Sequence, residues 1–203
     1  SYNNTGGWLM LCPSDVAFDR NFVSQEGTVV RYNVSINDGT RDYVKGNGQT
    51  LSSTIDVVGR VGGCHFYNNT VIKTRSAATH ADNTAITFDS YTNIEGSLVF
   101  TNNIFYNTTG TANPFTKVGT GEFIDDRGLI LRNNCICGYQ EGTIPGSGSH
   151  NVGTILTDPK FVRLVEEFTA SNNLVDKEQI LAGLQLAAGS PCIGAGAGIA
   201  DEP

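Results

Sequence analysis

A group of acidic and basic side chains in the first third of the chain is the part of the sequence best suited to acid–base chemistry. The group comprises Asp19, Arg20, Arg31, Asp38, Arg41 and Asp42, which His65 would join if neighbouring repeats stack. Carboxylates can bind a calcium ion or act as general acids and bases. The candidate catalytic residues are therefore Asp19, Asp38, Arg41 and Asp42. The alternative, which we favour, is that Asp38 and Asp42 are turn residues and that the arginines form a solvated face.

The remaining titratable residues give little sign of a metal centre. The sequence has no CxxC pair, and its three histidines, His65, His80 and His150, are scattered along the chain. This spacing argues against zinc. Asp125 and Asp126 are adjacent, but we interpret them as a turn. The identity of any metal is thus unknown from the sequence, and no cofactor is certain.

Four short stretches of the chain share one frame: an apolar triplet, a polar residue, one or two asparagines, then more apolar residues. Their last asparagines are Asn33, Asn69, Asn103 and Asn134, at spacings of 36, 34 and 31 residues. Such a period indicates stacked repeats, and the β-branched and aromatic residues indicate strands. An asparagine at a corner can adopt a left-handed backbone and can hydrogen-bond the equivalent amide one coil away. We therefore predict that Asn69, Asn103 and Asn134 form the asparagine ladder of a right-handed parallel β-helix.

The expected fold is all-β: one right-handed parallel β-helix domain over residues 1–203, with about five or six coils and long protruding loops. We expect a first strand at 7–12, intervening strands at 55–58, 85–88 and 123–124, and loops at 73–83, 106–121 and 138–153. The apolar spacing in 164–184 instead suits one or two short helical turns. The chain opens close to a strand without an initiator methionine or a signal peptide, so we expect the C-terminal part of a longer or processed chain.

The composition indicates a soluble extracellular protein. Lysine and arginine total 13, aspartate and glutamate total 20, and the net charge is -7. Nucleic acid and anionic membranes are therefore poor partners, because both require basic patches. No apolar stretch approaches the ~20 residues that span a bilayer.

Four N-x-[ST] sequons favour a glycosylated, secreted protein. They begin at Asn3, Asn33, Asn68 and Asn107. Asn107 lies in a polar turn and is the best acceptor. Asn68 precedes the inward Asn69, and neighbouring strand residues face opposite ways, so Asn68 should point to solvent. Asn33 falls on the ladder frame, where an inward side chain could not carry a glycan.

The five cysteines leave the disulfide pattern open. An odd count allows at most two internal bridges, and the possible partners are Cys12, Cys64, Cys135 and Cys192. Cys135 and Cys137 would face the same side of a strand and cannot easily bridge each other. The alternative is that the cysteines are buried as small apolar residues.

The end of the chain carries a family resemblance. Asp158–Val162, followed by Leu184–Gly196, resembles the terminal coil of secreted proteins of the pectate-lyase-like superfamily, which includes uncharacterised members. Cys192 and Gly194 stand where that segment usually has alanine and aspartate. The resemblance implies a polysaccharide lyase, with calcium, or a glycoside hydrolase, acting on an extracellular acidic polysaccharide. The catalytic signatures of polygalacturonases and pectate lyases are nevertheless absent from the chain.

Two functions remain open after this comparison of motifs. The first, which we favour, is a secreted, glycosylated β-helix that acts by binding or end-to-end self-assembly in an extracellular fibre, coat or matrix. The second is the lyase or hydrolase just described. Carbohydrate is the expected partner in both, as attached glycan or as ligand. For a sugar platform we favour Tyr2, Trp8 and Tyr43, whereas the core is expected to take Phe66, Tyr67, Phe100, Phe105 and Tyr106.

Overall fold

The computed structural model is an all-β structure of short parallel strands, with one helix among the described residues. It describes residues 7–12, 24–39, 53–74, 84–89, 92–110, 113–117, 128–140, 144, 150–163 and 177–199. Within these ranges the chain runs repeatedly around the same four sheets, and each pass is called a circuit here.

The strands of successive circuits are short and similarly placed. The first circuit contains β1 (Leu9–Leu11), β2 (Gln25–Glu26), β3 (Val29–Arg31) and β4 (Val34–Ile36). The second contains β5 (Ile55–Val57), β6 (Arg60–Gly62), β7 (Cys64–Tyr67) and β8 (Thr70–Lys73). The third contains β9 (Ile86–Phe88), β10 (Asn93–Ile94), β11 (Leu98–Thr101) and β12 (Ile104–Asn107). The fourth contains β13 (Phe115–Lys117), β14 (Leu129–Arg132) and β15 (Cys135–Cys137). The last elements are β16 (Asn151–Val152) and α1 (Lys177–Gly183).

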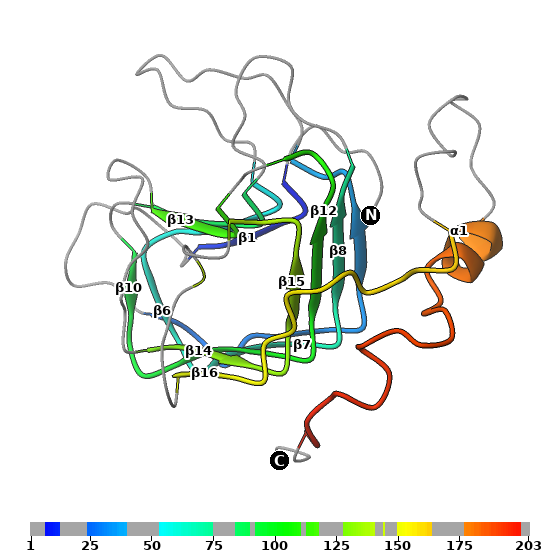
Figure 1. Cartoon of the computed structure of the whole chain (residues 1–203). Helices are drawn as coiled ribbons and strands as arrows, with labels where there is room; N and C mark the ends of the chain where they lie inside the picture. The colour runs from blue at the N-terminus through cyan, green and yellow to red at the C-terminus, as the bar shows by residue number, and fades with distance from the viewer. Residues whose placement is uncertain are drawn as a thin grey trace.

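Each strand pairs in parallel with the equivalent strand of the next circuit. The four sheets, named here by their first strands, have the orders β1-β5-β9-β13, β2-β6-β10, β3-β7-β11-β14-β16 and β4-β8-β12-β15. Figure 1 looks along the stack and shows the sheets as the sides of a closed outline around the core. This arrangement is compatible with a parallel β-helix.

The core consists of inward side chains that stack from one circuit to the next. In the β3 sheet, Val30, Phe66, Phe100 and Leu131 share one register position. The rings of Phe66 and Phe100 are stacked with centroids 4.7 Å apart, and Phe105 and Phe115 meet Phe100 edge to face. Burial of these large rings is the main stabilising contribution of the interior.

The β4 sheet is covered on its outer side as well. Ile36, Ile72 and Tyr106 point outward at one register position and form a second buried cluster. Phe161, Ile180 and Leu184, from the C-terminal part of the chain, pack against that cluster. In Figure 1, α1 accordingly lies outside the outline, beyond β8 and β12.

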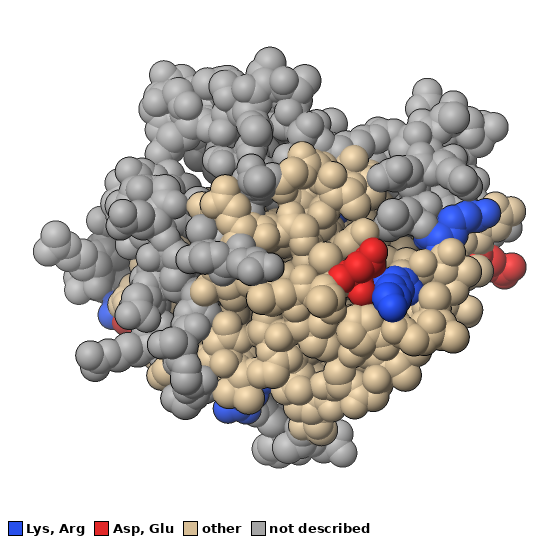
Figure 2. Space-filling model, in the orientation of Figure 1, with Lys and Arg blue, Asp and Glu red and all other residues tan. Residues whose placement is uncertain are grey.

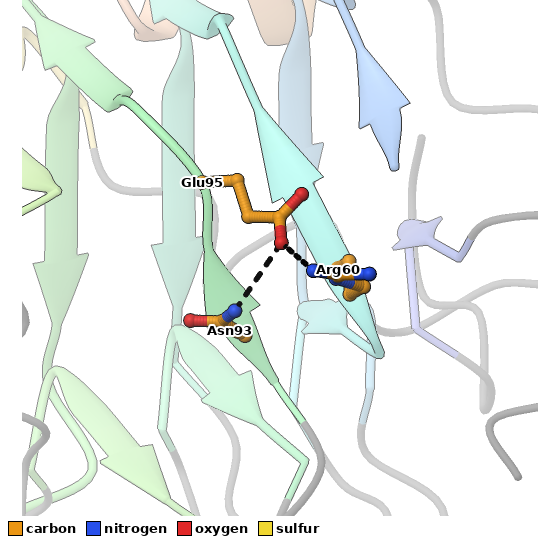
Figure 3. A network of polar contacts seen from close by, with 3 residues as sticks. All are labelled: Arg60, Asn93 and Glu95. Atoms are coloured by element: carbon orange, nitrogen blue, oxygen red, sulfur yellow. Dashed lines mark hydrogen bonds and ion pairs between the residues drawn. The ribbon is translucent and has the colours of Figure 1, made fainter. Parts of the chain in front are cut away.

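The described residues at the end of the stack seen in Figure 2 carry few charges. On the face in Figure 2, most of the described surface is uncharged, with only small acidic and basic groups. Arg60 on β6 forms an ion pair with Glu95, next to β10, and Asn93 donates to the same carboxylate oxygen at 3.5 Å (Figure 3). These side chains are partly exposed, so we assign the pair a small effect on stability.

Several expected element positions need correction. The expected loop at 106–121 contains β13, and the loop at 138–153 contains β16, which pairs with β14. The expected strand at 123–124 lies outside the described residues. The helical turns expected within 164–184 correspond to α1 over Lys177–Gly183. Four circuits are described, and β16 with the Cys135–Ile155 bridge begins another.

Candidate functional site

The asparagines of the repeated frame meet at the corner between the β3 and β4 sheets. Nδ2 of Asn33 donates to Oδ1 of Asn69 at 3.1 Å. In the same way Nδ2 of Asn69 donates to Oδ1 of Asn103 at 2.9 Å, and Nδ2 of Asn103 donates to Oδ1 of Asn134 at 3.0 Å. Each receiving oxygen also accepts the backbone N–H of the asparagine before it. The side chains form one column, where the sequence analysis expects the ladder, and it starts one circuit earlier, at Asn33.

The residue before each ladder asparagine has a different task. Tyr32, Asn68, Asn102 and Asn133 all adopt a left-handed backbone, with φ between 51° and 56°. Side chains with a β-carbon rarely adopt this conformation, and asparagine tolerates it best after glycine. The two asparagines of a pair therefore have separate roles: the first adopts the left-handed backbone of the turn, and the second forms the ladder hydrogen bonds. Tyr32 is the exception, because a bulky ring occupies the turn position.

Tyr32 belongs to an exposed cluster with Arg31 and Tyr67. Its side chain is 69% exposed, although a tyrosine ring is largely apolar. Nη1 of Arg31 donates to the Tyr67 hydroxyl at 2.9 Å, and the guanidinium lies 5.8 Å from the Tyr32 ring centroid and 5.9 Å from that of Tyr67. The two rings meet edge to face, 5.9 Å apart. The cation and the two rings thus hold one another in place on the surface.

The strand register explains why these side chains meet. Arg31 of β3 pairs with Tyr67 of β7, and Val29 pairs with His65. Val30 and Phe66 lie between them and point into the core, so alternation turns Arg31, Tyr67, Val29 and His65 outward. Tyr67 is therefore not a core residue as the sequence predicts, because its register position is an outward one. This outer face of β3 and β7 is the candidate binding surface.

Of the four predicted catalytic residues, only Asp38 lies among the described residues, and it is not part of that surface. Asp38 is fully buried, and its carboxylate accepts a hydrogen bond from Ser35 at 2.6 Å. Arg31 and His65 lie on the outer face of the β3 sheet instead. Asp19, Arg20, Arg41 and Asp42 lie outside the described residues, as do His80, Asp125 and Asp126. Among described residues, no three or more His, Cys, Asp or Glu side chains gather as metal ligands.

The remaining aromatic predictions divide between core and surface. Phe66, Phe100, Phe105 and Tyr106 are buried, as expected. Trp8, which we favoured as a platform, is partly buried against the core cluster. Tyr2 and Tyr43 lie outside the described residues. Tyr32 is not among the predicted site residues, although in the four aligned stretches it stands at the position of Asn68, Asn102 and Asn133.

Two sequon asparagines use their amide groups inside the structure. Asn107 is 3% exposed, and its Nδ2 donates to the carbonyls of Gly110 and Gly138, each at 3.2 Å. Nδ2 of Asn33 donates to Asn69 and to the Arg31 carbonyl. A glycan on either nitrogen would replace one of these bonds, so Asn107 is not the exposed acceptor that we expected. Asn68 is half-buried, and Asn3 lies outside the described residues.

The cysteines occupy three different environments. All five are thiols in this structure. Cys12 is exposed after β1, and Cys64 is buried in the main core cluster. Cys135 and Cys137 lie on the outer side of β15, beneath the C-terminal part of the chain, which contains Cys192.

Comparisons with known proteins add no identification. No protein-family model, curated protein or solved structure matches this chain. Among the described residues, no helix has the length and the apolar character that a membrane crossing requires.

Proposed function

We propose that the chain is a secreted right-handed parallel β-helix module, of the pectate-lyase-like kind, that binds an extracellular carbohydrate. Parallel strands in four sheets, the asparagine column and the sequence resemblance at residues 158–196 support this class. The general rule for connections between parallel strands supports the right-handed course that we propose. In this proposal the module serves in a fibre, coat or matrix and is a glycoprotein, for which Asn3 and Asn68 are the remaining acceptors.

The observation that carries the proposal is the strained, exposed Tyr32. A left-handed backbone costs a non-glycine residue about 1–2 kcal/mol, and asparagine, which the next three circuits use, relieves part of that cost. A ring that is 69% exposed gains little from burial in return. A backbone outlier that the local packing does not require is a reason to look for function at that position.

The cluster has the chemistry of a sugar platform. An exposed tyrosine ring offers an apolar face to the C–H groups of a pyranose, and its hydroxyl offers a hydrogen bond. The Arg31 guanidinium adds donors in a planar fork that suits a carboxylate. Tyr67 already holds that guanidinium at 2.9 Å, so little freedom is lost when a ligand binds. These features favour an acidic polysaccharide that contains uronate residues.

Binding of purified protein to polygalacturonate, alginate and a neutral glucan, measured by calorimetry, tests the proposal. We expect uronate polymers to bind, and Tyr32→Asn to weaken binding at least ~10-fold while raising the free energy of unfolding by ~1 kcal/mol. Arg31→Gln should weaken binding of the acidic polymers most. Met10→Asn is the matched control, because Met10 is 57% exposed on a different sheet, and it should leave binding unchanged.

The same samples separate binding from catalysis. Full binding by Tyr32→Asn, or an unchanged preference of Arg31→Gln for acidic over neutral polymers, would overturn the assignment of this cluster. Release of unsaturated products that absorb in the ultraviolet, in the presence of calcium, would favour the lyase alternative. Loss of that release in Asp38→Ala would then place the chemistry near Asp38.

A further inference from the structure

The end of the chain crosses the outer side of the asparagine corner. We call residues 189–199 the C-terminal strap. Nδ2 of Asn102 donates to the Ala197 carbonyl at 2.9 Å, and the Ala197 N–H donates back to Oδ1 of Asn102 at 2.8 Å. Nδ2 of Asn133 donates to the Ala195 carbonyl at 2.9 Å. The turn asparagines of two circuits therefore fix the strap in one position.

The beginning of the strap is fixed as well. The Ser190 hydroxyl is buried and donates to the Pro159 carbonyl at 2.5 Å, and it accepts the Cys192 N–H at 3.2 Å. Cys192 therefore lies between two residues that are fixed by hydrogen bonds, Ser190 and Ala195, and these bonds define its position.

Cys192 lies against Cys135 of β15. Both residues line a cavity of about 220 Å³ between the strap and the outer side of the corner, and Cys192 is near enough to add to the effect of burial in raising the pKa of Cys135. Cys135 is 3% exposed and its Sγ approaches the Thr157 carbonyl at 3.5 Å, whereas Cys192 is half-buried. The two sulfurs are thus neighbours, one beneath the strap and one on it.

The other cysteines are poorer partners for Cys192. Cys64 is enclosed in the main core cluster, and Cys12 follows β1 on a different sheet. Cys137 shares the outer side of β15, but it packs in the cluster around Tyr106 and does not line the cavity. Burial, and in addition the neighbouring Cys192, also raise the pKa of Cys137. Among the described cysteines, however, only Cys135 shares the cavity with Cys192, so we favour the Cys135–Cys192 pair.

We propose that Cys135 and Cys192 form a disulfide that locks the C-terminal strap to β15 in an oxidising compartment. A small-molecule disulfide such as oxidised glutathione is the oxidant. Cys192, the more accessible thiol, loses its proton and attacks the glutathione disulfide, which releases one glutathione thiolate. Cys135 then loses its proton and attacks the Cys192 sulfur, which forms the new bond and releases the second thiolate. The two released protons and thiolates give two molecules of reduced glutathione.

The order of attack follows from the surroundings of the two thiols. Burial, and then the neighbouring Cys192, raise the pKa of Cys135 above its ordinary value. A buried thiol with a raised pKa reacts slowly with an external disulfide. The covalent link would restrict the unfolded chain and should raise the Tm by about 5–10 °C.

The experiment equilibrates the full chain with oxidised glutathione and maps its cysteine-containing peptides by mass spectrometry without reduction. We expect the peptides of Cys135 and Cys192 to be joined, and dithiothreitol to lower the Tm by about 5–10 °C. Cys137→Ser is the matched control and should keep both the link and the Tm shift. Cys192→Ser should lose both, and because Cys192 is only half-buried this variant should still fold.

Two results would overturn the proposal: a link between Cys137 and Cys192, or five alkylatable thiols after oxidation. If Cys135→Ser does not fold, the peptide map and the Cys192→Ser variant still decide the question. The outcome is independent of the proposed carbohydrate binding, because Arg31, Tyr32 and Tyr67 lie outside the strap and its cavity. Oxidised and reduced protein should therefore bind uronate polymers equally.

Discussion

At the residue scale, the asparagine pair couples a backbone turn to a buried hydrogen-bond column. The repeated asparagines are predictable because their spacing is visible in the sequence, and this spacing predicts that Asn69, Asn103 and Asn134 lie at one corner. Spacing alone does not report φ, so the sequence predicts both the turn and the ladder for a single asparagine. The structure separates a left-handed first residue, such as Asn102, from a ladder residue, such as Asn103.

Replacing a central ladder residue should be costly. Asn103 accepts from the N–H and Nδ2 of Asn69, and its Nδ2 donates to the Phe66 carbonyl and to Asn134. Asn103→Ala would leave several of these buried groups without a partner, so we expect a loss of ~3 kcal/mol in the free energy of unfolding. Asn33→Ala, at the end of the column, should cost ~1 kcal/mol. Urea denaturation measures both, and equal losses would contradict a cooperative column.

The buried thiol of Cys135 should make the reduced protein sensitive to alkaline pH. Burial, and then Cys192, raise its pKa above the ordinary 9.0. Below pH 9 the folded and unfolded states both keep the proton; above it the unfolded state releases the proton first. The folded state then binds more protons, so stability falls as pH rises, by at most about 1.4 kcal/mol per pH unit.

Urea denaturation in the presence of a reductant, at a series of pH values, checks this. Cys135→Ser should show a smaller slope just above pH 9. The pKa of Tyr139 is also raised by burial, from an ordinary value of 10.0, so its contribution starts at higher pH. Parallel curves for the two proteins would mean that Cys135 does not titrate differently on folding.

At the scale of elements, the strands beside the asparagines were predictable and those between them were not. The repeated asparagine frame predicts the strands of the β3 and β4 sheets in each of the four circuits, because apolar residues stand before and after the asparagines. By contrast β10 has two residues, and β13 lies in a stretch that was expected to be a loop. Such strands owe their conformation to pairing with the neighbouring circuit, and a single sequence does not display that pairing.

The ends of β12 and β15 approach so closely that only glycine fits between them. A β-carbon on Gly138 would lie 1.7 Å from the Asn107 carbonyl oxygen, and φ is +79°. Gly96 is the matched control, because its φ is +89° and nothing lies within 4 Å of an added β-carbon. Gly96→Ala should cost ~1 kcal/mol from backbone strain alone, and Gly138→Ala should cost ~2 kcal/mol more. Thermal unfolding compares them, and similar Tm values would refute the close approach.

At the scale of the whole molecule, the candidate site was harder to predict than the fold. Arg31 and Tyr67 are 36 residues apart in sequence, and only the register of β3 against β7 brings them together. The predicted catalytic residues were grouped because they are close together along the chain. Closeness along the chain does not predict closeness across circuits: Asp38 is buried, whereas Arg31 faces outward.

We propose that the first circuit also offers a surface for self-association. Among the described strands, β1, β2, β3 and β4 each end their sheets, and an exposed strand edge can pair with another chain. The Thr28 carbonyl accepts from the His65 N–H, and the Tyr32 N–H donates to the Tyr67 carbonyl. Successive residues of a parallel strand alternate the side to which their backbone groups point, so the Val29 N–H points away from β7. We expect end-to-end species in sedimentation velocity that grow with concentration. Val29→Pro should reduce them with little change in Tm, and a monomer at every concentration would exclude this mode.

The stacking of circuits also dictates when each part of the protein can fold during synthesis. The ladder partners are separated by 36, 34 and 31 residues, so a circuit finds its neighbour only after that length of chain has emerged. At about 5–20 residues per second this takes roughly 2–7 seconds, far longer than loop closure. Folding should therefore follow the ribosome circuit by circuit. The strap, whose partners Asn102 and Asn133 are made much earlier, closes the outer side of the corner last.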